Sequence, residues 1–262
     1  MQKRHTDCKL YFQEQSITTR DFVLPYLGSF KPLTSQTSIL EIGCGEGGNL
    51  VPFLELGCKV TGVDISSGRI DKAEEYLSAF SGNRLRLINK DIYDCAGLLD
   101  PAYDIIIMRD VIEHIHDQEK FMGFIKRYLS LQGLFFLAFP PWYNPFGGHQ
   151  QICSNKILSI TPFYHILPRA IYSFILKAGG ENDQRIKDLL EIKETGISIE
   201  RFRKICSKNG YFIKDETLYL INPNYRVKFG LKPRKQFGII SALPHLRNYL
   251  TTCCYFILSG TP

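Results

Sequence analysis

The chain has 262 residues, of which 44% are hydrophobic and 22% charged, a composition that excludes a disordered or fibrous protein. It contains no apolar stretch long enough for a membrane span, and the polar residues 1–7 lead into no signal-like run. The net charge of +6 is uneven: residues 1–149 carry 15 Lys and Arg against 18 Asp and Glu, and residues 150–262 carry 17 against 8.

The eight cysteines are scattered and form no Cys-x-x-Cys pair. This pattern argues against a disulfide framework or a zinc site, so we expect reduced thiols and a cytoplasmic protein. The basic second half of the chain could meet an anionic partner, such as a phospholipid surface, a nucleotide sugar or a nucleic acid. A solvated basic face without a partner is the favoured interpretation of the same charge.

In chain order, apolar residues first recur at helical spacing over residues 8–30, so we expect an N-terminal helical segment at 1–35. Strands and helices then alternate, which predicts an α/β fold with a mostly parallel sheet and helices on both faces. Strands are expected at 38–42, 58–63, 84–89, 103–108, 134–139, 211–220 and 251–259, with helices at 48–57, 67–80, 117–130 and 198–210.

Two stretches interrupt this alternation, and we interpret residues 150–198 and 222–249 as helical lid insertions within a single domain spanning 1–262. A loop rich in proline and glycine, residues 140–150, leads into the first insertion from the end of a strand. Aromatic residues in and after this loop are expected to roof a closed pocket: Trp142, Tyr143, Phe146, Phe163, Tyr164 and Tyr172.

A glycine-rich loop follows the first strand. Residues 38–42 read as a short buried strand that contains Glu41, and Gly43, Gly45 and Gly47 follow before a helix begins. Glycine permits a positive φ and a close approach of backbone to a ligand, and a helix N-terminus presents unpaired N–H groups. A dinucleotide-binding loop would look similar. However, Glu41 would crowd a pyrophosphate and suits a cationic ligand, and Asp64 and Asp91 end later apolar runs.

The ordered motifs resemble the class I S-adenosylmethionine-dependent methyltransferases, in the branch of the ubiquinone-type small-molecule enzymes. They are Glu-x-Gly-x-Gly-x-Gly at 41–47, Val-Asp-Ile-Ser at 63–66, Asp-Ile at 91–92 and the run from Tyr103 to Ile115. The resemblance covers about residues 36–140. It implies a Rossmann-like seven-stranded sheet whose last strand is antiparallel, and S-adenosylmethionine as the cofactor.

The resemblance also implies roles for single residues. The glycine loop would pass against the methionine part of the cofactor, and Glu41 would orient the positively charged end of that part. Asp64 would accept hydrogen bonds from both ribose hydroxyls, and Asp91 would accept hydrogen bonds from the adenine amino group. The full set of expected cofactor-binding residues is Glu41, Gly43, Cys44, Gly45, Gly47, Asp64, Ile65, Asp91, Ile92, Arg109 and Asp110. From the N-terminal segment, Tyr11 and Phe12 could cover the cofactor.

Methyl transfer to oxygen usually needs a base, and His149, His114 and His116 are candidates near the expected site. We assign the catalytic role to His149 and His114. A related arrangement of acids and histidines binds a divalent metal in some ubiquinone-type and small-RNA methyltransferases. The corresponding residues here are Asp110, Glu113, His114 and His149, a mixture that suits magnesium, manganese or zinc. We hold a metal to be the less favoured interpretation.

The leading hypothesis is therefore a methyltransferase acting on an oxygen or nitrogen atom of a small molecule or a cell-envelope precursor. The first alternative is an RNA methyltransferase that contacts phosphates through the basic second half. The second alternative is a protein that binds S-adenosylmethionine without catalysis.

Overall fold

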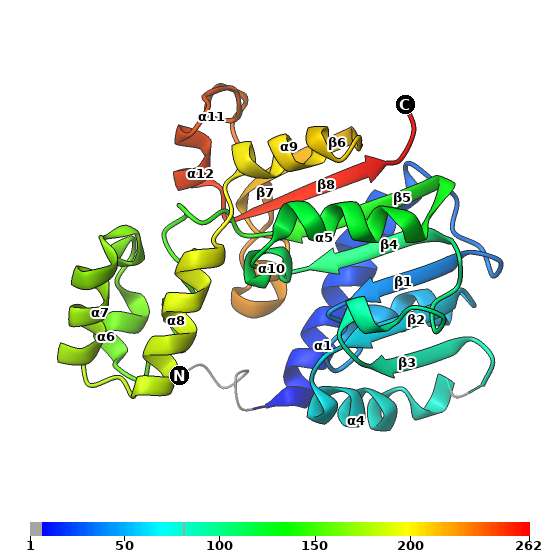
Figure 1. Ribbon diagram of the computed structural model, residues 1–262, viewed down its shortest axis with the longest axis horizontal. Helices are drawn as coiled ribbons and strands as arrows, with labels where there is room; N and C mark the ends of the chain where they lie inside the picture. Colours follow the sequence, from blue (N-terminus) through cyan, green and yellow to red (C-terminus); the bar gives the residue numbers. More distant parts are fainter. Residues whose placement is uncertain (1–6, 81) are drawn as a thin grey trace.

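The computed structural model describes residues 7–80 and 82–262, and it places them in one α/β layer structure (Figure 1). The polar start of the chain at residues 1–6 and the first residue of the expected turn at 81–83 lie outside the described residues. The strands are β1 (Ser38–Ile42), β2 (Lys59–Asp64), β3 (Leu85–Asn89), β4 (Tyr103–Arg109), β5 (Leu129–Phe139), β6 (Phe212–Ile221), β7 (Arg234–Lys235) and β8 (Cys253–Ser259).

These strands form one sheet in the order β3-β2-β1-β4-β5-β8-β6-β7. The first five strands of the chain pair in parallel, and β8 enters between β5 and β6 antiparallel to both. The expected topology is confirmed, including the antiparallel last strand. The expected number of strands was one short, because the two-residue β7 from the second insertion pairs with the edge of β6.

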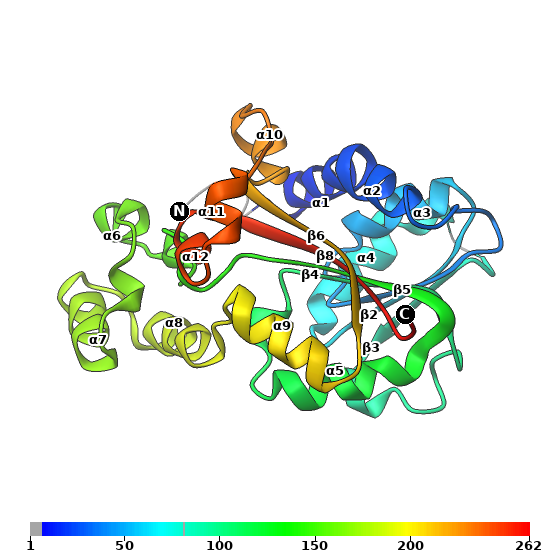
Figure 2. The ribbon, with the colours of Figure 1, turned by 90° about the horizontal axis from the view of Figure 1, so that it is seen from above.

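The helices cover both faces of the sheet (Figure 2). They are α1 (Cys8–Thr18), α2 (Leu24–Gly28), α3 (Val51–Glu55), α4 (Ser67–Tyr76), α5 (Gln118–Ile125), α6 (Lys156–Ile160), α7 (Arg169–Ala178), α8 (Asp183–Thr195), α9 (Ile199–Lys208), α10 (Asn224–Phe229), α11 (Gly238–Ala242) and α12 (Leu246–Leu250). Short 3₁₀ turns include η3 (Gly48–Leu50), η5 (Ile92–Asp94) and η6 (Ile112–His114), and a π-helical turn η2 (Thr19–Val23) joins α1 to α2.

Alternation along the buried strands separates two hydrophobic cores. Leu40 and Ile42 of β1 face one side, where α5 and α9 pack, and Ile39 faces the other side with residues of α2, α3 and α4. Successive side chains of a strand point to opposite faces, so a strand buried on both faces is apolar at nearly every position. This is why β4 reads as an almost unbroken apolar run.

Two expected boundaries were wrong. The helix predicted over 117–130 ends earlier, and β5 begins at Leu129 instead of 134, because Leu129 pairs with Tyr103 before a bulge shifts the register. The helix predicted over 48–57 is divided into η3 and α3, with Pro52 in the first turn of α3, where a missing N–H costs nothing.

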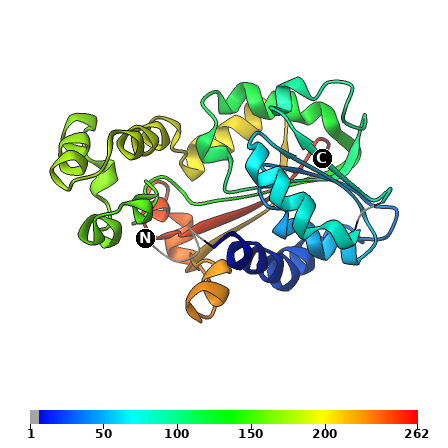
Figure 3. The same cartoon turned by 90° about the horizontal axis from the view of Figure 1, so that it is seen from below.

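The insertion at 150–198 builds a small core of its own. Cys153, Tyr164, Tyr172, Leu176, Ile186 and Leu189 form this core between α6, α7 and α8. The predicted charged helix at 183–194 is present as α8, although one side of it is buried in this core. Figures 1 and 3 show α6–α8 standing beyond the edge at which β1 and β4 end. The insertion thus lies on the side of the sheet where ligands bind in open α/β folds.

Candidate active site

The glycine loop after β1 is shaped by three residues with left-handed backbone. Gly43, Gly45 and Gly47 have φ angles of 71°, 53° and 81°. A Cβ at Gly43 would lie 2.4 Å from a Val111 methyl, and one at Gly47 would lie 2.6 Å from a Leu77 methyl. At Gly45 the nearest such neighbour is the Arg69 side chain at 3.9 Å, so this position has room beside it. The loop is therefore packed at its ends and open in the middle, where a ligand can approach the backbone.

Asp64, at the end of β2, fixes the open middle of this loop. Its Oδ2 accepts a hydrogen bond from the Gly45 N–H at 2.8 Å, and its Oδ1 accepts one from the Ser66 N–H at 2.9 Å. A carboxylate oxygen has two lone pairs, so both oxygens can still accept a hydroxyl donor. The neighbouring Ile65 is 73% exposed, an apolar side chain presented to whatever binds beside Asp64.

The end of β3 brings a second acid to the same edge of the sheet. Asn89 is paired with Asp64 in the parallel ladder, and Asp91 follows two residues later. Asp91 is exposed, and its Oδ1 accepts a hydrogen bond from the Tyr93 N–H at 2.9 Å, which caps η5. The side chain of Ile92 is buried, so only its backbone is placed to meet a ligand. The structure thus brings Asp64 and Asp91 to adjacent strand ends, as the sequence predicted.

Glu41 lies in a buried polar network that the sequence did not reveal. Its Oε1 accepts a hydrogen bond from Asn49 Nδ2 at 2.7 Å, and the Asn49 Oδ1 accepts from Arg109 Nη1 at 2.6 Å. Thr19 completes the network, because its hydroxyl donates to Asn49 Oδ1 at 2.9 Å and accepts from Arg109 at 2.8 Å. Nothing in the sequence indicated Thr19, whose partners Asn49 and Arg109 are 30 and 90 residues away, or the link from Asn49 to Arg109 across 60 residues.

Two polar atoms of this network have unfilled hydrogen-bonding capacity. Glu41 Oε2 and Arg109 Nε are buried and have no hydrogen-bond partner among the described residues. Burial raises the pKa of Glu41 to about 8, while the bond from Asn49 and the charge of Arg109 oppose that rise. A cationic ligand beside Glu41 would favour its ionised form. The site is therefore suited to a positively charged group.

The N-terminal helix α1 lies directly against the glycine loop. A Cβ at Gly48 would fall 2.4 Å from the Phe12 carbonyl oxygen, so glycine is needed for this approach. Tyr11 has its pKa raised to about 12, chiefly by burial and then by the charge of Asp110. Tyr11 thus lies beside the site, whereas the ring of Phe12 packs on Tyr76 with centroids 5.0 Å apart.

Two expected cofactor residues contribute differently from the others. The Cys44 side chain is buried, and a Cβ on Gly62 of β2 would lie only 2.9 Å from its sulfur, so Cys44 offers its backbone alone to the loop. Asp110 follows β4 with a φ of 53°, a conformation that costs energy outside glycine and recurs at functional sites. Its N–H is held by the Ala138 carbonyl at 2.8 Å.

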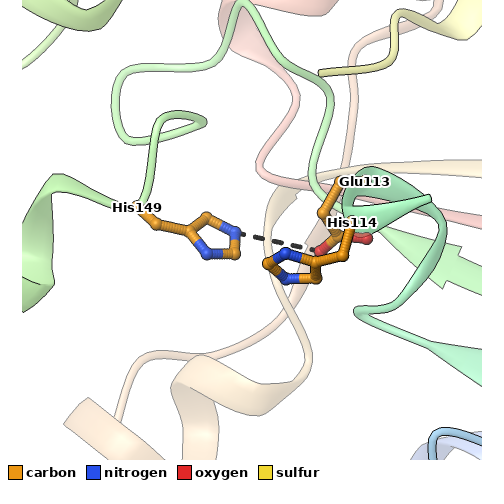
Figure 4. A group of neighbouring side chains, drawn as sticks. All are labelled: Glu113, His114 and His149. Atoms are coloured by element: carbon orange, nitrogen blue, oxygen red, sulfur yellow. Dashed lines mark ion pairs between the residues drawn. The ribbon is translucent and has the colours of Figure 1, made fainter. Parts of the chain in front are cut away.

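Figure 4 shows the two predicted catalytic histidines facing one buried carboxylate. The rings of His114 and His149 meet edge to face, with their centroids 5.1 Å apart. His149 Nε2 is 3.8 Å from Glu113 Oε1. Neither oxygen of Glu113 has a hydrogen-bond partner among the described residues. Burial, followed by the charge of Asp110, raises the pKa of Glu113 well above its usual range.

Three of the four predicted metal ligands come together. One ligand atom from each of Glu113, His114 and His149 lies within 4.8 Å of the others, and Asp110 is not part of this group. A carboxylate with two imidazoles fits zinc or manganese by donor chemistry, and the unpartnered buried oxygens of Glu113 fit as well. His116 is separate, because it is exposed and lies 3.3 Å from Glu191.

The expected aromatic roof was wrong for two of its six residues. Tyr164 and Tyr172 are buried in the core of the insertion. Trp142 packs against Gly196, where an added Cβ would lie 2.5 Å from the indole, and against His165. Tyr143 and Phe163 instead contact Tyr249, with ring centroids 5.4 and 6.4 Å away. Aromatic spacing in the sequence could not distinguish the core of an insertion from a pocket wall.

A comparison with protein families agrees with this geometry. The model of a methyltransferase domain matches residues 13–150, which is more than half of the chain. The matched region includes the glycine loop, the turn that carries Glu113 and His114, and the acids Glu41, Asp64 and Asp91. This chain belongs to that methyltransferase family. The matched region begins within α1 and includes residues 13–18 of this helix.

Curated relatives of this methyltransferase domain include ubiquinone biosynthesis O-methyltransferases. That of Bartonella tribocorum is 33% identical over 100 residues, or 38% of this chain and 40% of the relative. That of Rickettsia akari is 22% identical over 215 residues, covering 80% and 77% of the two chains. The chain spans about two fifths of the length of the Bartonella relative and of a Rickettsia conorii relative.

Solved structures share the fold. The magnesium protoporphyrin IX methyltransferase of Synechocystis PCC 6803 with bound S-adenosylhomocysteine superposes with a TM-score of 0.53 at 15% identity, covering 94% of this chain and 83% of that one. At such identity the likeness establishes the architecture of the methyltransferase domain.

Proposed function

We propose that this methyltransferase domain binds S-adenosylmethionine and transfers its methyl group to an oxygen or nitrogen atom of a small molecule or cell-envelope precursor. The observation that carries the proposal is the position of Asp64. One buried carboxylate holds the open glycine loop through Gly45 and lies beside the exposed Ile65. The ribose diol of the cofactor needs a hydrogen-bond acceptor such as Asp64, and the adjacent adenine ring needs an apolar surface such as Ile65.

The residues present fit this cofactor. Gly45 leaves space at the loop, Asp64 can accept two hydroxyl donors, Ile65 offers an apolar surface, and Asp91 is exposed at the adjacent strand end. Glu41, whose second oxygen lacks a hydrogen-bond partner among the described residues, supplies negative charge for the cationic end. Arg109 would hold Glu41 and Asn49 in place, acting as a positioning residue.

The bound cofactor supplies an electrophilic methyl group on a sulfonium. The protein's task is then to hold the acceptor in line and to accept its proton. His149 is the proposed base: the acceptor O–H or N–H would give its proton to the imidazole while the oxygen or nitrogen bonds the methyl. Glu113, 3.8 Å from His149, would orient the ring. His114 would border the same space.

A metal ion is the second candidate for this cluster. Glu113, His114 and His149 would hold it, and it would polarise the acceptor hydroxyl as a Lewis acid. Exhaustive chelation distinguishes the two accounts. Methyl transfer that survives chelation supports the base, and activity restored only by added zinc, manganese or magnesium supports the metal.

Two further parts of the proposal concern the partner and the compartment. We favour a small acceptor over RNA, because the basic residues of the second half alternate with apolar ones instead of forming a continuous stripe. We favour the cytoplasm because all eight cysteines are free thiols and seven of them are buried. A helix able to cross a membrane does not occur within residues 7–80 or 82–262.

The proposal is tested with S-adenosylmethionine that carries a labelled methyl group. The protein is incubated with a panel of small hydroxylated and amino metabolites and, separately, with transfer RNA, beside the Asp64→Ala variant. Label transferred to a small acceptor by the wild type and lost in the variant supports the proposal. Label transferred to RNA alone would show that the acceptor is RNA and not a small molecule. Binding of the cofactor without transfer to any acceptor would favour the non-catalytic alternative.

A further inference from the structure

The loop that carries His149 is held at both ends by one buried histidine of the first insertion. His165 belongs to the 3₁₀ turn η9 (Tyr164–Ile166), and its side chain is fully buried. Its Nε2 lies 2.8 Å from the carbonyl oxygen of Trp142, near the start of the loop. Its Nδ1 lies 3.0 Å from the side-chain nitrogen of Gln150, the residue directly after His149. One imidazole therefore joins the two ends of the loop.

These contacts define the protonation of the His165 ring. The Trp142 carbonyl can only accept a hydrogen bond, so the ring carries its proton on Nε2. Nδ1 then accepts a hydrogen bond from the Gln150 amide, which also donates to the Pro145 carbonyl at 2.9 Å. Burial lowers the pKa of His165 to about 4, although the bond to Trp142 opposes that change. The ring stays neutral near pH 7 and both of its nitrogens are occupied, so it is not a second base.

The insertion also constrains the backbone on either side of this contact. A Cβ on Gly148 would lie 2.3 Å from the His165 Cβ, so the residue before His149 is packed against the ring. His149 itself has a φ of 56°, a conformation that persists only where the surrounding structure enforces it. Lys193 of α8 donates to the His165 carbonyl at 2.8 Å and thereby fixes η9. The orientation of His149 thus depends on contacts with the insertion.

The opposite half of the cluster is anchored to the same insertion. Thr195, at the end of α8, donates a hydrogen bond from its hydroxyl to the Glu113 carbonyl. The buried side chain of Gln118, in α5, donates to the Ile112 carbonyl at 2.9 Å and to the Thr195 carbonyl at 2.6 Å. The turn η6, which carries Glu113, is therefore attached to α8. It follows that the spacing of 3.8 Å between His149 and Glu113 depends on how the insertion holds the loop.

We propose that His165 is a positioning residue, which holds the loop so that the imidazole of His149 faces Glu113. Its effect on turnover rests on the proposed function, in which His149 is the base. A reacting group that is displaced by about 1 Å can lose about 100-fold in rate, even when the substitution lies away from the chemistry. The glycine loop and Asp64 lie at other strand ends, so the cofactor site should not need His165.

The test compares three variants of the full chain. His165→Leu removes both hydrogen bonds of the ring, and His165→Gln keeps a donor that can reach the Trp142 carbonyl. Leu176→Ala is the control, because Leu176 is fully buried in the core of the same insertion and forms none of the bonds to the loop. Circular dichroism verifies that each variant is folded, and urea unfolding measures how far each is destabilised.

Nitrogen-15 spectra of the imidazole rings, recorded with a chelator present, give a readout that needs no acceptor. In the wild type we expect one of the six histidines to be neutral with its proton on Nε2, and its signals to be absent from both His165 variants. The signals of His149, assigned with His149→Asn, should shift in His165→Leu, shift less in His165→Gln and stay in place in Leu176→Ala. Unchanged His149 signals in both His165 variants, or equal shifts in Leu176→Ala, would overturn the proposal.

Turnover gives the second readout. His165→Leu should lower kcat by about 10-fold to 100-fold and leave the affinity for S-adenosylhomocysteine unchanged, and His165→Gln should recover part of the loss. An equal loss of kcat in Leu176→Ala would show a general effect of destabilising the insertion, and would also overturn the proposal. A wild type that turns over no acceptor would count against the proposed function, whereas the imidazole spectra would still decide whether His165 positions His149.

Discussion

Asn49 donates a 2.7 Å hydrogen bond from its side-chain amide to Glu41, and its carbonyl oxygen accepts one from Arg109 at 2.6 Å. One amide thereby connects the acid of β1 to the cation at the end of β4, and Thr19 joins them to the N-terminal segment. Glu41, Asn49 and Thr19 are buried and Arg109 is partly buried, so these groups depend on one another for their hydrogen bonds.

Replacement of Asn49 by leucine should therefore destabilise the protein. Asn49→Leu removes bonds to both Glu41 and Arg109 and leaves buried polar atoms without partners, at a cost of about 1–3 kcal/mol. Urea unfolding measures this loss. Asn83→Leu, in an exposed turn, is the matched control and should change stability little. Equal losses in the free energy of unfolding for the two variants would show that the network does not stabilise the protein.

The raised pKa of Glu41 predicts a pH dependence of stability. Because the pKa is about 8 in the folded protein against 4.5 as the ordinary value, the folded state binds more protons between these limits. Stability should fall as pH rises through this window, by at most about 1.4 kcal/mol per pH unit. Glu41→Gln should remove this part of the slope, and Glu74→Gln on the surface of α4 should keep it. Identical slopes in wild type and Glu41→Gln would contradict the assignment.

Gly47 should not tolerate a side chain. Its φ of 81° costs a non-glycine residue about 1–2 kcal/mol, and an added Cβ would meet Leu77 at 2.6 Å. We expect Gly47→Ala to lower the thermal midpoint and to weaken cofactor binding. Gly68→Ala is the control, because Gly68 lies in helix α4 with no neighbour within 4 Å and should be neutral or stabilising. A fully stable Gly47→Ala variant would contradict the described loop conformation.

His149 should affect turnover more than cofactor binding. If it accepts the acceptor's proton, His149→Asn should lower kcat by about 100-fold or more and leave the affinity for S-adenosylhomocysteine unchanged. His116→Asn, an exposed histidine paired with Glu191, is the control. Equal kcat values for the two variants would exclude His149 as the base.

The sequence predicted most of the framework because the signals were local. The apolar runs of β1 and β4, the glycines that need positive φ, and the acids at the ends of β2 and β3 can each be read within a few residues. These features also carried the resemblance to the family whose model matches residues 13–150.

The parts that were missed depend on contacts between distant segments. Thr19 meets Arg109 across 90 residues, and β7 exists only because Arg234 and Lys235 meet the edge of β6. Tyr172 was expected near a pocket and is fully buried between α7 and α8, because the insertion needs a core of its own. Residue type and spacing do not specify such packing.

We propose that the open glycine loop and Asp64 hold S-adenosylmethionine. The most direct measurement is a calorimetric titration of the purified protein with S-adenosylhomocysteine, with Asp64→Ala and with NAD as the competing ligand. We expect micromolar binding of S-adenosylhomocysteine that Asp64→Ala loses, and no binding of NAD. Binding of NAD in its place, or no binding of S-adenosylhomocysteine to the wild type, would contradict it.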